Sequence, residues 1–239
     1  MKGALRLLLL CALALATLQL FLVLRIAAMV VWAPSSTTFE RSEAWRIATT
    51  KGTLPWRQRW VDYEKISDNL KRAVLASEDD GFSNHDGVDW NAIEKAWSKN
   101  AKAEQRAEAS NSTRPAKVVG GSTITQQLAK NLFLSGERTL LRKAQELVLT
   151  LTLEALLSKK RILEIYLNHV EWGEGVFGAE AAAQHYFRKP ASALTPFEAS
   201  RLAVMLPRPK YFEKLPNSAY LSGRAGIIAG RLGHAQLPD

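Results

Sequence analysis

The apolar residues of the chain are most densely clustered near its N-terminus, between Leu7 and Leu24. Only Thr17 and Gln19 interrupt this 18-residue run. As an α-helix rising roughly 1.5 Å per residue, the run would be about 27 Å long, which is close to the thickness of the hydrocarbon core of a bilayer. The pattern therefore predicts one membrane-spanning helix.

Charged residues on either side of this run predict its orientation. Lys2 and Arg6 precede the run, Arg25 follows it, and no acidic residue occurs before Glu40. By the positive-inside rule, the N-terminus is expected in the cytoplasm and the remainder of the chain outside it. A cleaved signal peptide is the alternative, but the apolar run exceeds the usual length of such a segment and no A-x-A cleavage site follows it.

The anchor divides the chain into three expected parts. Residues 1–34 are predicted to form the cytoplasmic N-terminus and the transmembrane anchor, and residues 35–59 a membrane-proximal linker. Residues 60–239 are predicted to form the main domain, which is long enough to bury a sizeable core.

Beyond the anchor, apolar residues recur at helical spacing and strict alternation is absent, which predicts an all-α domain. Ile66, Leu70, Ala73 and Val74 form the first such stripe. Further helix signals are the stripe of Ile124, Leu128 and Leu132, the long pattern from Thr139 to Leu157, the N-cap Ser158, and the capping box Thr195-Pro196-Phe197-Glu198 with a stop at Leu206-Pro207.

One interval departs from helical spacing. Residues 98–117 are polar, with charges of alternating sign, and residues 111–115 read Asn-Ser-Thr-Arg-Pro. Such a composition is typical of turns and solvated segments. We therefore predict a mobile loop or a frayed helix end here.

Charge and cysteine content narrow the classes of partner. The 239 residues include 32 Lys and Arg against 23 Asp and Glu, a net charge of +9, which favours anionic partners. Because the anchor places the domain outside the cytoplasm, phospholipid head groups and lipid-linked phosphates are expected, and nucleic acid is not. The single cysteine, Cys11, lies in the apolar run, so an intramolecular disulfide and a Cys-based metal cluster are excluded.

The first run of candidate chemistry is EDDGFSNHDG at residues 78–87. Glu78 lies four and eight residues beyond Val74 and Leu70, so it continues the apolar face of the predicted helix. Burial raises the pKa of a carboxylate, which suits a general base or acid. The plainer alternative is an acidic helix end at the surface. We expect His85 to be a hydrogen-bonded structural residue, because no second His lies at metal-ligand spacing.

The second run is GGSTITQQLAKN at residues 120–131. Glycines that lead into a helix opening with Ser and Thr create an N-terminus that favours anions. The side chains of Gln126, Gln127 and Lys130 suit sugar and phosphate groups. The run lacks the full phosphate-loop pattern, so it does not indicate a nucleotide site.

Two more runs follow, RKAQE at residues 142–146 and KKRILEIYLN at residues 159–168. Arg142, Lys143 and Glu146 share one helical face, as an ordinary surface ion pair would. Because the same face continues into Leu149 and Leu153, the ion pair is expected to enter an apolar environment.

In order, the four runs match the motifs E-D-x-x-F-x-x-H-x-G, G-x-S-T-I-T-Q-Q-L-x-K-N, R-K-x-x-E and K-x-x-I-L-E-x-Y-L-N. These are motifs of the biosynthetic peptidoglycan glycosyltransferases, family 51, and the chain resembles that family over roughly residues 60–215. The resemblance is closest to the monofunctional branch, because the chain contains no S-x-x-K or K-T-G transpeptidase signature. The interval between Gly87 and Gly120 is longer and more polar than the family pattern.

The resemblance implies a mostly α-helical, lysozyme-like glycosyltransferase domain that polymerises lipid II and releases undecaprenyl pyrophosphate. It implies that Glu78 is the general base for the acceptor 4-OH and that Glu146 is a second essential carboxylate, which positions cations or a divalent ion. It also implies that Lys130 and Arg138 stabilise the pyrophosphate. The substrate-binding residues implied are Phe82, Ser122, Gln126, Gln127, Lys130, Asn131, Arg138 and Lys143.

The same resemblance implies partners and a location. The partners are lipid II, the nascent glycan strand and membrane lipids, with cell-division or elongation proteins as further candidates. No metal-ligating residue is predicted, and a divalent cation, Mg²⁺ or Mn²⁺, stays open as a cofactor. The location implied is the cell inner membrane, with one pass, the N-terminus in the cytoplasm and the catalytic domain in the periplasm.

Two other functions share part of this pattern. A lytic transglycosylase or lysozyme would share the fold and one glutamate, but it cleaves glycan and needs neither Lys130 nor Arg138. A non-catalytic wall-assembly scaffold would share the anchor, but it would not need Glu78 and Glu146 together.

Overall fold

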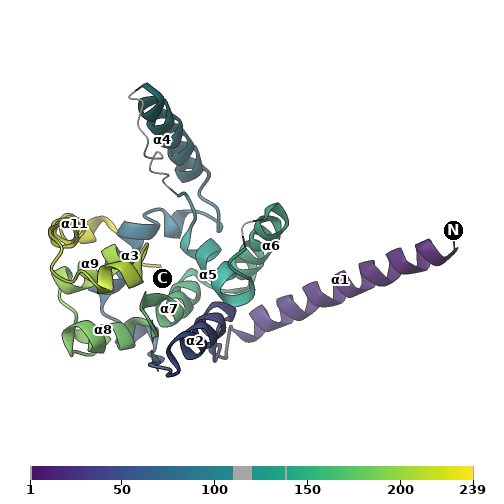
Figure 1. The fold of residues 1–239 in the computed structure, drawn as a ribbon, viewed down its shortest axis with the longest axis horizontal. Coiled ribbons are helices and arrows are strands. Elements are labelled where there is room, and N and C mark those ends of the chain that lie inside the picture. Colours follow the sequence, from purple (N-terminus) through teal and green to yellow (C-terminus); the bar gives the residue numbers. More distant parts are fainter. Residues whose placement is uncertain (1, 110–119, 138, 239) are drawn as a thin grey trace.

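The computed structural model describes residues 2–109, 120–137 and 139–238, and helices dominate them (Figure 1). The helices are α1 Lys2–Ala28, α2 Thr38–Lys51, α3 Asp68–Glu78, α4 Trp90–Ala109, α5 Ile124–Phe133, α6 Leu140–Leu156, α7 Lys159–His169, α8 Ala179–Phe187, α9 Pro196–Met205, α10 Pro209–Glu213 and α11 Ala219–Ala229. Short 3₁₀ helices are Tyr63–Lys65, Phe82–Asn84, Ala191–Ala193 and Leu232–His234. The mostly α-helical fold is confirmed.

A small sheet corrects the stricter expectation of an all-α domain. Its strands are β1 Arg57–Gln58, β2 Glu171–Gly173 and β3 Val176–Phe177, in the order β1-β3-β2. β1 pairs in parallel with β3, and β2 pairs antiparallel with β3. Strands of two or three residues are too short to establish an alternating pattern, so the sequence carries no signal for them.

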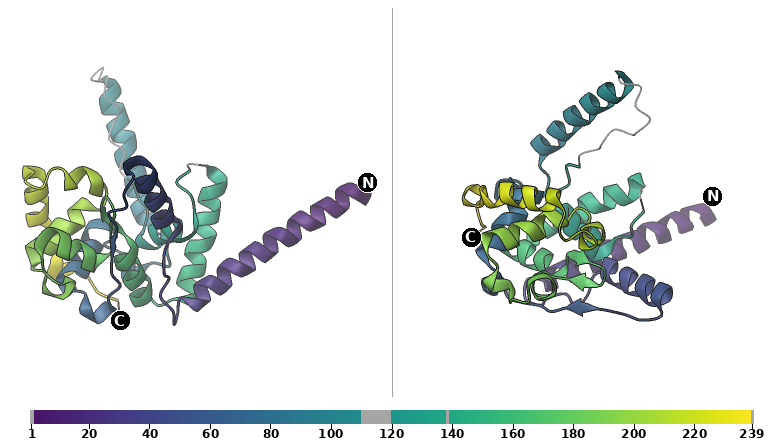
Figure 2. Two further views of the ribbon diagram at one scale, coloured as in Figure 1. Left: turned by 60° about the horizontal axis from the view of Figure 1, so that its bottom comes forward. Right: turned by 60° about the vertical axis from the view of Figure 1, so that its left-hand side comes forward.

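Helix α1 agrees with the predicted membrane span. Its most apolar window has a mean hydropathy of 2.7 and no buried residue, and the helix extends away from the rest of the molecule in each view (Figures 1 and 2). Its C-terminal end is docked on the domain: Ile26 and Met29 are buried, and Arg161 Nε of α7 donates a hydrogen bond to the Met29 carbonyl at 2.8 Å. One end of α1 is therefore held against the domain while the other is free of it.

The segment between the anchor and residue 60 is folded onto the domain. It contains α2, which begins with a capping box of Thr37 and Glu40, and β1 of the sheet. The Glu40 carboxylate lies 2.8 Å from His169 Nδ1 of α7, and both side chains are buried. The segment predicted as a linker thus carries regular structure and core contacts.

The predicted helix boundaries agree closely with the structure where local signals are strong. The apolar stripe of α3 is buried, and Ser67 caps this helix. Ser158 caps α7, and Thr195 opens α9 with the predicted capping box and an N-terminal proline. These signals act within a few residues, so they operate before tertiary contacts do.

The expectation of a loop from residue 98 is wrong as far as residue 109. These residues complete α4, which projects from the domain in all views (Figures 1 and 2). Residues 98–109 read SKNAKAEQRAEA, and Ala, Lys, Glu, Gln and Arg all have high helix propensity. Residues 110–117 of the predicted loop lie outside the described residues.

The core brings the ends of two helices together. α3 packs against α9 and α11, whereas α5 packs against α6, α7 and α2. A continuous set of buried apolar side chains connects both groups. In this arrangement the C-terminal end of α3, where Glu78 lies, meets the N-terminal end of α5.

Candidate active site

The start of α5 is held by residues of the first run. Asp79 Oδ2 accepts a hydrogen bond from the Ile124 amide at 2.9 Å, and the Thr123 hydroxyl caps the helix by accepting from the Gln126 amide. The Thr123 hydroxyl also donates to the Gly87 carbonyl at 2.6 Å. A carboxylate beside exposed helical N–H groups is favourable. The first two sequence runs are therefore joined at a defined position.

His85 is a structural residue, as the sequence predicts. Its Nδ1 accepts a hydrogen bond from the Gly87 amide at 3.1 Å, so its Nε2 donates to Asp79 Oδ1, which lies 2.9 Å away. Gly87 has a φ of 86°, and a Cβ there would lie 2.7 Å from Cγ2 of Thr150. Glycine is required at this position for both reasons.

Glu78 lies at the end of a chain of side-chain hydrogen bonds. Gln127 Nε2 donates to Glu78 Oε2 at 3.1 Å, and the Tyr166 hydroxyl donates to Gln127 Oε1 at 3.0 Å. Burial raises the pKa of Glu78, and the neighbouring Asp79 adds to the rise, whereas the bond from Gln127 lowers it. Such a carboxylate can accept a proton from a neutral hydroxyl group.

The second carboxylate, Glu146, forms the buried ion pair that the sequence predicts. Its side chain is nearly inaccessible, with Leu149 and Leu153 buried on the same face of α6. Arg142 Nη1 lies 2.6 Å from Oε2, and Lys143 Nζ pairs with Oε1. Both oxygens therefore hold cations in place, and neither is free to act as a base.

A pocket of about 330 Å³ lies between α5, α6 and the segment that joins them. Ser122, Gln126, Gln127, Lys130, Asn131, Arg142, Lys143 and Glu146 are among its lining residues. The concentration of cationic and amide groups suits an anionic ligand.

Lys130 faces this pocket without an ion-pair partner in the described part of the chain. Its side chain reaches solvent, yet the protein surrounding it lowers its pKa by desolvation. Arg142 and Lys143 lower the pKa further, whereas Glu146 raises it. A phosphate entering the pocket would relieve this repulsion among neighbouring cations.

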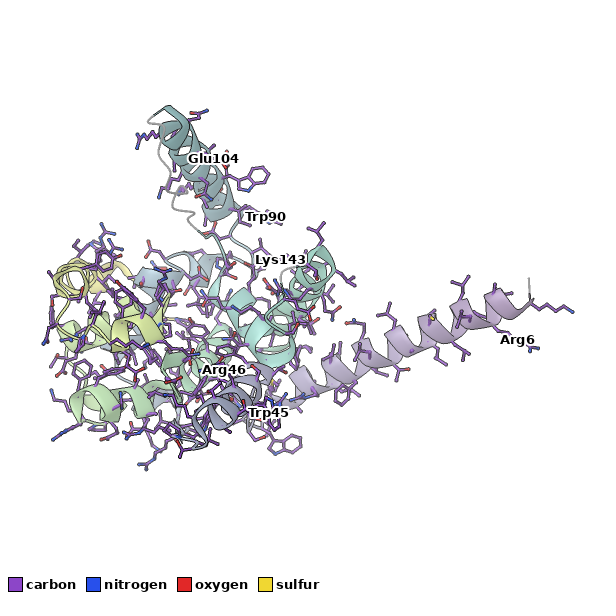
Figure 3. All side chains as sticks on the ribbon, in the orientation of Figure 1. Arg6, Trp45, Arg46, Trp90, Glu104 and Lys143 are labelled. Atoms are coloured by element: carbon purple, nitrogen blue, oxygen red, sulfur yellow. The ribbon has the colours of Figure 1, made fainter. Side chains whose placement is uncertain are left out.

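A larger cleft of about 1170 Å³ lies on the other side of Ser122. Glu78 and Asp79 line it at one end, the first turns of α4 form one wall, and Leu147 and Leu151 of α6 contribute to the opposite wall. In Figure 3, Trp90 marks the base of α4, with Lys143 beside α6 below it. Since Ser122 lines both the pocket and the cleft, the two spaces are adjacent, with Glu78 near their junction.

The structure brings most of the predicted site residues together, with two exceptions. Phe82 is only 1% exposed and packs in the core, with Lys159 Nζ 4.6 Å from its ring centroid; it lines neither the pocket nor the cleft. Arg138 lies outside the described residues. Gln126 lines the pocket, but its Oε1 accepts from the Thr123 amide in the capping box, so only its amino group is left for a ligand.

Two polar residues of the site were not singled out from the sequence. Asp79 orients both His85 and α5, and Tyr166 holds Gln127 against Glu78. Burial holds the pKa of Tyr166 well above 10, so its hydroxyl stays a donor. Both residues lie inside the quoted runs, and Tyr166 falls among the buried apolar positions of α7. A tyrosine on an apolar helix face is the signal that could have identified the second one.

The residues present do not fit a divalent cation bound directly at Glu146. Each of its oxygens already accepts from a cationic side chain. Among the described residues, no group of three or more His, Cys, Asp or Glu side chains is arranged to hold a metal ion.

Comparison with known proteins agrees with this geometry. A family model described as Transglycosylase matches residues 46–233. The chain is 56% identical to a biosynthetic peptidoglycan transglycosylase of Burkholderia thailandensis, over 92% of this chain and 82% of that protein. It is 53% identical to one of Burkholderia pseudomallei over the same shares, and 52% identical to one of Paraburkholderia phytofirmans over 86% of this chain and 81% of that protein. The chain therefore belongs to the transglycosylase family.

Proposed function

We propose that the chain polymerises lipid II into β-1,4-linked glycan strands and releases undecaprenyl pyrophosphate, without transpeptidase activity. The observation that carries this proposal is the contact of Gln127 with Glu78. Gln127 also lines the cationic pocket, so it places a carboxylate of raised pKa next to a site for an anionic leaving group. The names of the similar transglycosylases support the same substrate class.

In this reaction Glu78 acts as the general base. It takes the proton of the acceptor 4-OH while that oxygen forms a bond to the anomeric carbon of the donor. The bond from this carbon to the pyrophosphate breaks, and its electron pair leaves with the pyrophosphate. Direct displacement inverts the α-linked donor into a β-1,4 linkage.

The leaving group needs charge stabilisation and no strong acid. We assign that role to Lys130, which faces the pocket, and to Arg138, whose role rests on the family resemblance alone. Glu146 positions Arg142 and Lys143 around the same pocket. Ser122, Asn131 and the amino group of Gln126 supply hydrogen bonds to the sugar or phosphate groups.

The location and the division of the chain belong to the same proposal. α1 would cross the cell inner membrane once, with the N-terminus in the cytoplasm, and the transglycosylase domain would work in the periplasm. The docking of Met29 on α7 supports a site held close to the membrane, where the polyprenyl tail of the substrate lies.

The decisive experiment is to incubate the purified full-length chain with labelled lipid II and to analyse the products. We expect long glycan polymer from the wild type and a rate about 10²–10⁴-fold lower from Glu78→Gln, because the amide keeps the shape of the carboxylate but cannot take the proton. Glu64→Gln, at an exposed position, is the matched control. Cleavage of existing glycan without polymer would indicate a lytic enzyme, and near-normal turnover of Glu78→Gln would remove the base assignment.

A further inference from the structure

The helix that projects from the domain carries a basic stripe, which we define as Lys95, Lys99, Lys102 and Arg106 of α4. These residues follow one another at spacings of four, three and four, so they share one face of the helix. All four side chains are exposed, and none forms an ion pair within the described part of the chain. The stripe therefore presents four positive charges to solvent.

The first two residues of the stripe line the larger cleft. Lys95 and Lys99 contribute to the same 1170 Å³ space as Glu78. The end of the cleft near Glu78 is acidic, with Asp80 and Asp86 among its lining residues. Asp89, directly before α4, lines the cleft as well. The cleft is thus divided by charge along the chain, with its carboxylates on residues 78–89 and its ammonium groups on α4.

This division matches the two ends of a lipid II acceptor. The 4-OH that reacts lies on the outer, neutral sugar, whereas the diphosphate lies at the opposite end of the disaccharide. With the 4-OH at Glu78, carboxylates such as Asp80 and Asp86 repel a diphosphate, and the lysines of α4 attract one. An acceptor bound in the reverse direction would bring its diphosphate against the acidic end.

We propose that Lys95 and Lys99 bind the diphosphate of the acceptor lipid II and orient its 4-OH toward Glu78. This proposal rests on the proposed function and assigns a diphosphate site separate from the Lys130 pocket, which takes the leaving group of the donor. Lys102 and Arg106 continue the stripe beyond the cleft and draw the anionic acceptor toward it.

The opposite wall of the cleft suits the rest of the acceptor. Leu147 and Leu151 of α6 are 38% and 50% exposed. α6 also contacts the anchor, because the side-chain amides of Gln19 and Gln145 exchange two hydrogen bonds, at 2.9 and 3.2 Å. A polyprenyl chain that leaves the diphosphate can therefore follow an apolar helix toward the membrane span.

The test separates acceptor binding from donor binding. The full-length chain in neutral detergent is given lipid II as acceptor and an excess of a lipid-linked donor whose own 4-OH is blocked. The initial rate is measured for the first coupling product that carries the block. For the double variant K95Q/K99Q we expect the KM for the acceptor to rise about tenfold or more, with kcat and the KM for the donor changed less than about twofold. K95R/K99R should restore much of the loss, K102Q/R106Q should have a smaller effect, and Lys214→Gln, an exposed lysine that lines neither space, should have none.

Four other outcomes would contradict the proposed function or the diphosphate site. If the wild type forms no product, the proposed function itself fails. If the wild type is active and K95Q/K99Q keeps a normal acceptor KM, or loses donor and acceptor binding equally, the diphosphate site is wrong. A loss seen only in anionic phospholipid vesicles would assign the stripe to membrane head groups instead. If the loss vanishes with an acceptor that lacks the stem peptide, the stripe binds the peptide carboxylates. Either of these last two results overturns the proposal.

Discussion

The side-chain amide of Gln127 lies between the partly buried carboxylate of Glu78 and the buried hydroxyl of Tyr166. Its amino group donates to Glu78, and its carbonyl accepts from the Tyr166 hydroxyl, which stays protonated. The orientation of the amide is therefore determined by Tyr166, and the bond to Glu78 favours the ionised carboxylate against the effect of burial. Gln127 of α5, oriented by Tyr166 of α7, therefore adjusts the basicity of Glu78 at the end of α3.

Gln127→Leu tests this arrangement. The substitution removes the bond that lowers the pKa of Glu78, so the pKa should rise further. Because the base works only when ionised, the acidic limb of the pH–rate profile for polymerisation should move to higher pH. Tyr166→Phe keeps the Gln127 side chain but removes the hydrogen bond that orients it, so this variant should give a smaller shift in the same direction. A limb that stayed in place or moved to lower pH would contradict the assignment.

Glu146→Gln should behave differently from any change at Glu78. The amide leaves Arg142, which is only 16% exposed, without its ion pair, and the free energy of unfolding should fall by about 3 kcal/mol. That estimate is the lower end for a broken buried pair, because Lys143 is half exposed. The activation barrier should rise by about 2–4 kcal/mol, as for Lys130→Gln or Arg138→Gln, with the acidic limb unmoved, whereas Arg138→Lys should keep part of the activity. Loss of the limb in Glu146→Gln would reverse the roles of the two carboxylates.

At the scale of elements, α5 carries most of the pocket, and its position depends on its first turn. Gln127, Lys130 and Asn131 all lie on this helix of ten residues. Its N-terminus is held by Thr123 from within the helix cap and by Asp79 from the end of α3. A change in the cap therefore moves several ligand-binding groups together.

Thr123→Ala should lower both stability and activity. We expect a loss of about 0.5–2 kcal/mol in the free energy of unfolding, the usual range for an N-cap, with a clear fall in kcat/KM because the helix loses its link to Gly87 as well. Thr195→Ala is the matched control, since Thr195 caps α9 in the same way but lines neither the pocket nor the cleft. Equal activity losses in both variants, measured beside their thermal unfolding, would show that α5 has no special role.

At the scale of the whole molecule, two helices extend from one domain in different directions (Figures 1 and 2). The surface of α1 is apolar. α4 has two different faces: one carries the basic stripe, and the other carries the exposed side chains of Trp90 and Trp97. The contacts of Ile26 and Met29 hold the C-terminal end of α1 against the domain. The site is thereby held in a fixed position relative to that end of the helix.

A topology experiment tests the orientation of the whole chain. A reporter fused after Asp239 should be active only outside the cytoplasm, because Lys2 and Arg6 retain the N-terminus inside. A second reporter, of a kind that is active only in the cytoplasm, should be active when fused before Met1, and the purified chain should keep its N-terminal segment. Cytoplasmic activity of the first fusion, or an N-terminus near Pro34, would disprove the anchor.

Helix signals that act over a few residues could be recognised from the sequence alone. The stripe of α3, the long pattern of α6 and the caps Ser158 and Thr195 predicted helices whose bounds the structure confirms within a few residues. The same reasoning missed the sheet, whose strands are too short to show a period. It also took the second part of α4, residues 98–109, for a mobile loop or a frayed helix end. Helix propensity prevailed over polarity in α4, because a helix that projects into solvent needs no apolar face.

The four motif runs, the long apolar N-terminal helix and the helical class were thus determined by the sequence itself, because hydrophobic period, charge bias and capping are local properties. Only the packing of the elements decided which motif side chains lie in the core and which line the site. Phe82 turns into the core, whereas Gln127 meets Glu78 across a separation of 49 residues. The raised pKa of Glu78, the burial of Glu146 and the grouping of residues around the cleft arise from contacts between α3, α4, α5 and α6. Burial and electrostatic fields depend on groups distant in the chain, and a one-dimensional pattern does not contain their separation in space.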